Sequence, residues 1–369
     1  MTDATAPAKG KVQFIGHAGW KPFALATAIG ATGGLAFFML RMPLAWMMGA
    51  AVFCTVAAMS GARVGVPTRL RQIMMVVLGV LLGSGFSPDV VDHFRDWGVS
   101  MAVLIVASVA SGYVIFALLR FHGGYDARTA YFSASPGGLN EMVTMGAAYG
   151  ANERVIALIH AVRILTVVMT IPIFYRIMYG AVSSVSQAAG NATDLTVRDV
   201  AILVACGVVG AVAARRARMP AAMMFGPMLL SGVVHLAGIT QSKPPVEMVA
   251  FAQVIIGSAL GCRFVGSRFR EVVRHLVYGV VAAAILILLA VAFAWLARAS
   301  TGLPIDSLVL SYAPGGFAEM SLVGLALGAD IAMVASHHLF RVFCIVLVGT
   351  WVFRRFVDPA LPPAADRDD

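Results

Sequence analysis

The chain repeats Ser133-Ala-Ser-Pro-Gly-Gly-Leu-Asn-Glu-Met142 as Ser311-Tyr-Ala-Pro-Gly-Gly-Phe-Ala-Glu-Met320 in its second half. Near the start of each copy, Arg41-Met-Pro43 matches Arg218-Met-Pro220 at nearly the same separation. The separation between the two long motifs also relates further pairs, namely Gly79 and Gly257, Gly83 and Gly261, Phe86 and Phe264, Gly150 and Gly328, His160 and His338, and Arg163 and Arg341. A register held over so many positions indicates a duplicated unit of roughly 160 residues.

The duplication divides the chain into two repeats with a linker between them. We place the first repeat at residues 22–180 and the second at 199–357. The linker, 181–198, contains a polar stretch rich in Ser, Ala, Asn and Gln. Residues 1–21 form an N-terminal tail, and residues 358–369 form a C-terminal tail.

The composition indicates that the solvent of this protein is lipid. The chain is 60% hydrophobic and only 12% charged, with a mean hydropathy of +0.86, whereas soluble domains contain about 25% charged residues. Membrane β-barrels alternate apolar and polar residues, but residues 281–294 contain no polar side chain at all. The sequence therefore predicts an all-α polytopic membrane protein.

Each repeat contains six apolar blocks. In the first repeat they cover about 22–40, 43–59, 70–86, 99–119, 129–150 and 155–178, and in the second about 199–214, 220–238, 247–262, 275–297, 307–328 and 331–353. Pro-Gly-Gly interrupts the fifth block of each repeat, and it breaks a helix because proline lacks the N–H donor and glycine has low helix propensity. The fifth block is either a broken crossing helix or a re-entrant hairpin.

The distribution of the basic residues favours the hairpin. The chain carries 27 Lys and Arg and a net charge of +9. Five crossings per repeat place most of these residues, Arg71 and Arg263 among them, on the cytoplasmic side, as the positive-inside rule requires. Six crossings would move the basic residues of the second repeat outside. We therefore predict two inverted repeats of about five transmembrane helices plus one broken or re-entrant segment each, with both termini cytoplasmic.

The duplicated Pro-Gly-Gly-x-x-Glu-Met motif is followed about twenty residues later by His-x-x-Arg. This paired pattern resembles the membrane AbrB family with its "AbrB duplication" domain, and the resemblance covers about residues 20–357. Members are often labelled ammonia monooxygenase or AbrB-type regulator. The resemblance implies a multi-pass protein of the bacterial inner membrane that is linked to regulation of gene expression.

Neither label follows from the residues themselves. A copper or iron oxygenase needs clustered imidazole or carboxylate ligands, and the eight histidines form no H-x-H or H-x-x-x-H pair. A DNA-binding protein needs a water-soluble module that presents a helix or ribbon to a groove. We therefore expect no enzyme activity, no metal, no cofactor and no direct nucleic-acid binding, so any regulatory effect would be indirect. The lipid bilayer is the expected partner, and a homo-oligomer is compatible with the sequence.

Ionisable residues inside a membrane are functional candidates by default. Helices that restart after a break present free N–H groups, and inverted repeats commonly place ligands where such half-helices meet. In this interpretation arginine supplies positive charge, glutamate takes up a proton or a cation, and histidine titrates. The candidate solute- or ion-binding residues are Ser135, Pro136, Gly137, Gly138, Asn140, Glu141, His160, Arg163, Pro314, Gly315, Gly316, Glu319, His338 and Arg341.

Two questions stay open at this point. Each glutamate could pair with the arginine of its own repeat and serve architecture alone. The chain could be a secondary transporter or exporter of a small anionic or zwitterionic solute coupled to H⁺ or Na⁺, or a membrane sensor without transport. In the functional interpretation we expect both Glu/His/Arg sets to converge on one central site, with the arginines within reach of the glutamates directly or through water.

Overall fold

The computed structural model describes residues 19–86, 94–179, 189–266 and 269–358, and all its regular elements within these ranges are helices. The first repeat contains α1 (Trp20–Met39), α2 (Ala45–Met59), α3 (Thr68–Gly83), α4 (Phe94–Ala117), η2 (Leu118–His122), α5 (Ala127–Ala134), α6 (Leu139–Ala148) and α7 (Glu153–Tyr179). The linker contains η3 (Ala192–Asp194). The second repeat contains α9 (Val197–Arg216), α10 (Ala222–Leu236), α11 (Val246–Gly261), η4 (Cys262–Phe264), α12 (Phe269–Thr301), α13 (Ile305–Tyr312), α14 (Phe317–Leu327), α15 (Ile331–Val352) and η5 (Phe353–Val357). The order of the α-helices is thus the same in both repeats.

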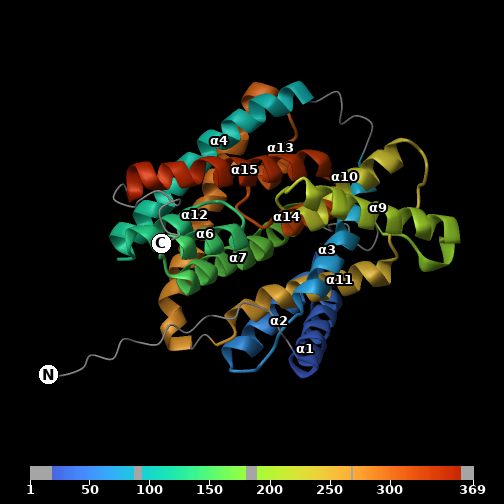
Figure 1. The fold of residues 1–369 in the computed structure, drawn as a ribbon, viewed down its shortest axis with the longest axis horizontal. Helices are drawn as coiled ribbons and strands as arrows, with labels where there is room; N and C mark the ends of the chain where they lie inside the picture. The colour runs from blue at the N-terminus through green and yellow to red at the C-terminus, as the bar shows by residue number, and fades with distance from the viewer. Residues whose placement is uncertain (1–18, 87–93, 180–188, 267–268, 359–369) are drawn as a thin grey trace, which may run out of the picture.

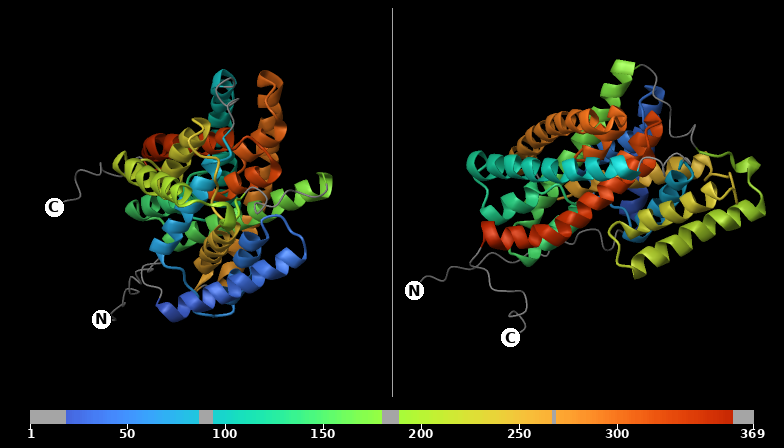
Figure 2. Two further views of the ribbon diagram at one scale, coloured as in Figure 1. Left: turned by 90° about the vertical axis from the view of Figure 1, so that its right-hand side faces the viewer. Right: turned by 90° about the horizontal axis from the view of Figure 1, so that it is seen from above.

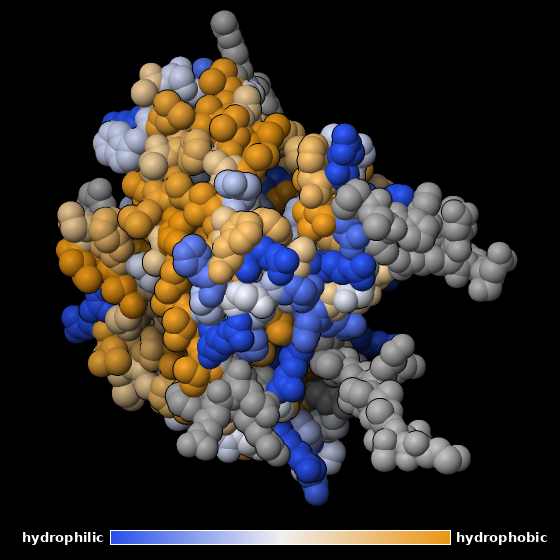
Figure 3. All heavy atoms as spheres, turned by 90° about the vertical axis from the view of Figure 1, so that its left-hand side faces the viewer, coloured by the Kyte–Doolittle hydropathy of each residue, from blue (hydrophilic) through white to orange (hydrophobic). Residues whose placement is uncertain are grey.

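The prediction of a helical polytopic membrane protein is confirmed at this level. Seven helices of the described residues are long and apolar enough to cross a membrane, and apolar side chains cover much of the face in Figure 3. α2, α3 and α10 have only 15 or 16 residues. At 1.5 Å per residue they are about 22–24 Å long, shorter than the hydrocarbon core of about 30 Å. Five crossings per repeat therefore stay a prediction, and the two predicted tails lie almost entirely outside the described residues.

The helices form two bundles that lie side by side (Figures 1 and 2). The scaffold bundle consists of α1, α2, α3, α9, α10 and α11, and the core bundle consists of α4 to α7 and α12 to α15. Each bundle therefore contains the equivalent half of both repeats. The bundles meet where α14 packs on α3 and where α7 packs on α2 and η4.

Within the scaffold bundle the two repeats exchange their third helices. α3 packs on α9 and α10 of the second repeat, and α11 packs on α1 and α2 of the first. A Cβ added at Gly79 would overlap the carbonyl of Met224, and one added at Gly257 would overlap the carbonyl of Met47, which is equivalent to Met224. Reciprocal contacts between equivalent residues are what a two-fold relation produces. Gly79 with Gly83 in α3 and Gly257 with Gly261 in α11 have the small-x-x-x-small spacing of a helix-packing face, and each pair lies against a neighbouring helix.

The structure decides between the two alternatives for the fifth block. The amide N of Asn152, after α6, donates to Thr129 Oγ1 at the start of α5 over 2.9 Å. The equivalent amide of Asp330 donates to Ser307 Oγ at the start of α13 over 3.1 Å. The outer ends of the two arms therefore meet, so each Pro-Gly-Gly segment is the tip of a hairpin.

Candidate functional site

The tips of both hairpins line one cavity of about 190 Å³ between the scaffold bundle and the core bundle. Its walls also include parts of α3, α7, α11 and α15. The polar side chains that line it are Arg71, Asn140, Glu141, Arg163, Arg263, Glu319, His338 and Arg341. Both repeats therefore contribute their glutamate and their arginine to one cavity, and the second repeat also contributes its histidine.

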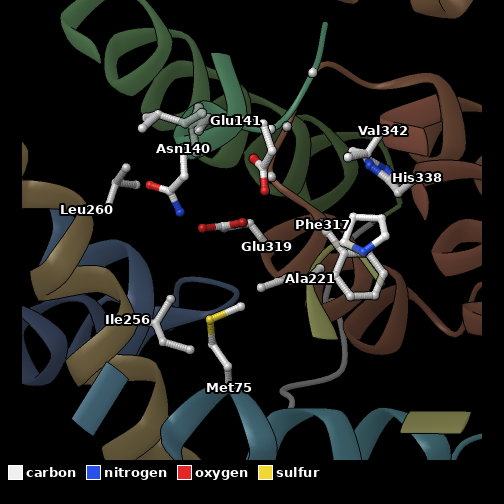
Figure 4. Close-up of a pocket in the computed structure, with 18 of the residues that line it drawn as sticks. Met75, Asn140, Glu141, Ala221, Ile256, Leu260, Phe317, Glu319, His338 and Val342 are labelled. Atoms are coloured by element: carbon white, nitrogen blue, oxygen red, sulfur yellow. The ribbon is translucent and has the colours of Figure 1, made fainter. Parts of the chain in front are cut away.

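The second glycine of each Pro-Gly-Gly makes room for a glutamate. Gly138 and Gly316 have extended backbones and are the N-caps of α6 and α14. Glu141 and Glu319 occupy the third helical position, and a Cβ on either glycine would overlap the Oε2 atom of the glutamate in its own repeat. Each carboxylate therefore folds back over the positive end of its helix. In Figure 4 both glutamates extend into the same space.

The first glycine of each motif makes room for the methionine that ends it. A Cβ at Gly137 would lie 2.9 Å from Met142 Cε, and one at Gly315 would lie 2.7 Å from Met320 Cε. Both distances are shorter than Cβ contacts normally are. The spacing Pro-Gly-Gly-x-x-Glu-Met thus describes one tight turn whose glycines lie against the glutamate and the methionine that follow.

Arg163 and Arg341 bind the ends of the half-helices that precede the Pro-Gly-Gly breaks. They are only 2% and 4% exposed. Arg163 donates to the carbonyl of Ser135 over 3.3 Å, and Arg341 donates to the carbonyl of Ala313 over 2.9 Å. Both carbonyls belong to the C-cap residues of α5 and α13, so each guanidinium lies at the negative end of a half-helix.

Direct pairing of each arginine with the glutamate of its own repeat, one of the alternatives left open by the sequence, is not seen as an ion pair within 4 Å among the described residues. The ion pair within 4 Å that the described part of the chain shows is Arg128 with Asp358, at 2.6 Å. Glu141 and Glu319 instead interact electrostatically with Arg71 and Arg263. Arg163 and Arg341, here called the inner arginines, instead donate to the carbonyls at the C-terminal ends of α5 and α13.

The two histidines differ in their surroundings. His338 lines the cavity (Figure 4). Its Nδ1 accepts from Arg341 over 2.8 Å, so Nε2 carries the proton that it donates to the carbonyl of Leu310 over 3.0 Å. This arrangement holds His338 in its neutral form. His160 is fully buried, donates from Nδ1 to the carbonyl of Ile156 and lies outside the cavity lining.

Two further candidates also lie outside the lining, namely Ser135 and Pro314. The hydroxyl of Ser135 donates back to the carbonyl of Tyr131 over 2.9 Å, so its side chain serves the end of α5. Asn140 does line the cavity and accepts from Arg263 over 3.1 Å. Within the described ranges, no three His, Cys, Asp or Glu side chains are grouped so that they could hold a metal ion.

Sequence reasoning missed Arg71 and Arg263 as site residues, since it assigned both to the cytoplasmic side. The equivalent positions of the other repeat hold Val249 and Gly85, so the duplication does not mark these arginines. Arg71 lies near the start of α3, whereas Arg263 lies just after the end of α11. The start of α3 and the end of α11, which are equivalent helices, therefore line the same cavity.

Comparison with known proteins gives consistent matches over most of the chain. The family model described as "Transition state regulatory protein AbrB" matches residues 46–357. The "Uncharacterized protein YhjN" of Bacillus subtilis (strain 168) is 27% identical over 349 residues, which cover 86% of this chain and 89% of that protein. The "Putative regulator AbrB" of Escherichia coli (strain K12) is 23% identical over 333 residues, which cover 89% of this chain and 94% of that protein.

Proposed function

The chain belongs to the AbrB family, and we propose that it is a secondary transporter or exporter of a small anionic or zwitterionic solute, coupled to H⁺ or Na⁺. The observation that carries this proposal is the convergence of two hairpin tips, one from each repeat, on one cavity lined by arginine and glutamate. Transporters built from inverted repeats bind their substrates where broken helices meet.

In this proposal the arginines attract the solute and the glutamates take up the coupling ion. Glu141 and Glu319 face the same cavity, and Arg71 and Arg263 interact electrostatically with both of them. Uptake of a cation by the glutamates therefore changes the field that the solute meets. Such a linkage is what coupled transport requires.

The proposal includes an inverted arrangement of the repeats in the bacterial inner membrane, with both termini cytoplasmic. Inversion is supported by the fact that the start of α3 and the end of the equivalent helix α11 line the same cavity. It also includes that the chain is not an enzyme, needs no cofactor and does not bind nucleic acid directly. A homo-oligomer is compatible with it.

A second candidate is a membrane sensor that affects gene expression without transport. It is favoured by the name of the Escherichia coli relative and by the description of the family, both of which refer to regulation. Such a sensor would use the same cavity to bind a ligand, but no solute would cross the membrane.

Reconstitution in proteoliposomes separates the two candidates. Extracts of cells with and without the protein are compared to select metabolites that differ, and each is offered to the vesicles under an H⁺ or a Na⁺ gradient. Solute accumulation that collapses when the gradient is dissipated supports the transporter. Saturable binding without accumulation supports the sensor and contradicts transport.

A further inference from the structure

The cavity has an excess of positive charge. Its lining contains the guanidinium groups of Arg71, Arg163, Arg263 and Arg341 and the carboxylates of Glu141 and Glu319, with no other acidic or basic side chain of the described residues besides the neutral His338. With both carboxylates ionised, four positive and two negative charges leave a surplus of two. A solute that binds there must offset this surplus.

The two positive charges without a counter-charge are those of the inner arginines, Arg163 and Arg341. Arg71, Arg263, Glu141 and Glu319 line the same cavity and interact electrostatically, so the two carboxylates offset the charges of these two arginines. Arg163 and Arg341 are almost fully buried, and among the described residues their bonds go to uncharged atoms, with the Nε atom of each left without a hydrogen-bond partner. A buried charge without a counter-charge is costly.

The helix ends do not remove the surplus. The C-terminal ends of α5 and α13 face the inner arginines and contribute roughly half a negative charge each. The N-terminal ends of α6 and α14 lie in the same lining and contribute a similar positive charge each. These contributions cancel, so two full positive charges remain for a ligand.

We infer that the solute is a small divalent oxyanion, such as a dicarboxylate or a doubly charged phosphate, that binds between the inner arginines and the pair Arg71 and Arg263. Guanidinium groups bind carboxylate and phosphate oxygens in bidentate geometry. A monovalent anion leaves one charge unpaired, and a zwitterion leaves both. This inference rests on the proposed function, since it takes the cavity as the site where the solute binds.

Binding to the purified full-length chain in detergent tests the inference without requiring transport. The probes are succinate and inorganic phosphate as divalent anions, lactate as a monovalent anion and glycine as a zwitterion, at constant ionic strength and pH 8. We expect succinate or phosphate to bind at least about tenfold more tightly than lactate and glycine. Comparison of succinate with phosphate shows which oxyanion the cavity prefers.

Variants that change the charge of the cavity provide the second readout. Arg71→Gln should reduce the preference for the divalent probe over lactate, and Glu319→Gln should increase it. Arg298→Gln, on the exposed end of α12, is the matched control and should leave the preference unchanged. These variants spare the buried arginines, whose loss could prevent folding.

The inference is overturned if lactate or glycine binds as tightly as both divalent probes, or if no divalent probe binds at 10 mM, a concentration on the order of tenfold above a millimolar Kd. An unchanged preference in Arg71→Gln also overturns it. Binding of a divalent anion without flux in vesicles would refute the transporter but keep the inference. Flux of a zwitterion in vesicles would support the transporter but overturn the inference.

Discussion

Gly138 and Gly316 show how a single hydrogen atom in place of a side chain shapes the cavity. Alanine is less favourable than glycine at an N-cap position with an extended backbone. Its Cβ would also lie over the carboxylate of Glu141 or Glu319. We expect Gly138→Ala and Gly316→Ala to insert normally but to lose solute binding or flux, because the carboxylate must leave its position.

Measurement of flux and of membrane-inserted protein for the same variants checks this expectation. Gly98→Ala is the control, since a Cβ at this helical position meets nothing within 4 Å. Full activity in both hairpin variants would mean that the position of the carboxylates is unimportant.

Arg341 supports the end of a half-helix through its guanidinium group. It donates to the carbonyls of Tyr312 and Ala313 and to His338. Arg341→Lys keeps the charge but cannot reach all three acceptors. We expect thermal unfolding in detergent to report a loss of roughly 1–3 kcal/mol, the cost of leaving buried acceptors unpaired. Arg298→Lys at the surface should have little effect, and equal stability of the two variants would contradict this role.

Among the helices, the exchanged packing of α3 and α11 depends on the absence of side chains. A Cβ at Gly83 would overlap the carbonyl of Met228, and one at the equivalent Gly261 would lie 2.7 Å from the carbonyl of Ala51. We expect Gly83→Ala and Gly261→Ala to destabilise the protein by similar amounts, roughly 1–3 kcal/mol, because the helices must move apart.

Thermal unfolding in detergent measures both effects. Gly324→Ala is the matched control in a buried helical position, since the nearest atom to its Cβ would be 3.7 Å away. A large loss of stability in only one of the variants Gly83→Ala and Gly261→Ala would argue against the equivalence of α3 and α11.

Across the molecule as a whole, the two repeats have the same order of helices, but equivalent residues differ in whether they line the cavity. Met75 lines the cavity, whereas Gln253, at the equivalent position of the second repeat, is 3% exposed. The lining of the cavity is therefore not symmetric between the repeats, because Met75 contributes to it and Gln253 does not. We expect a water-soluble thiol reagent to modify Met75→Cys much faster than Gln253→Cys in detergent.

Labelling rates in a background without the four native cysteines provide this comparison. During solute turnover the rate at Gln253→Cys should rise, because a transporter exposes both sides in alternation. Equal rates in the absence of solute would show that the cavity is not one-sided.

The topology is a separate prediction for the entire chain. If the repeats are inverted with cytoplasmic termini, the linker lies outside, and Asn191 is an exposed linker residue that the structure describes. Asn191→Cys in the same background should react with an impermeant reagent in intact spheroplasts. Reaction only after lysis would place the linker inside and reject the proposed orientation.

Features that depend on local physics or on the duplication follow from the order of the amino acids alone. Composition specifies a lipid-exposed helical protein, and the constant separation between matching motifs locates equivalent helices. Pro-Gly-Gly specifies the positions of the breaks because helix propensity is a property of neighbouring residues. The glutamates that follow the breaks are candidates on a separate ground, because ionisable residues are costly inside a membrane.

How these parts combine could be learned only from the folded chain. The exchange of α3 and α11 and the presence of Arg71 and Arg263 in the cavity depend on contacts between distant segments. Neither arginine has a counterpart in the other repeat, so no periodicity marks it. The partners of Arg163 and Arg341 are backbone carbonyls, which every residue carries and which no sequence pattern distinguishes.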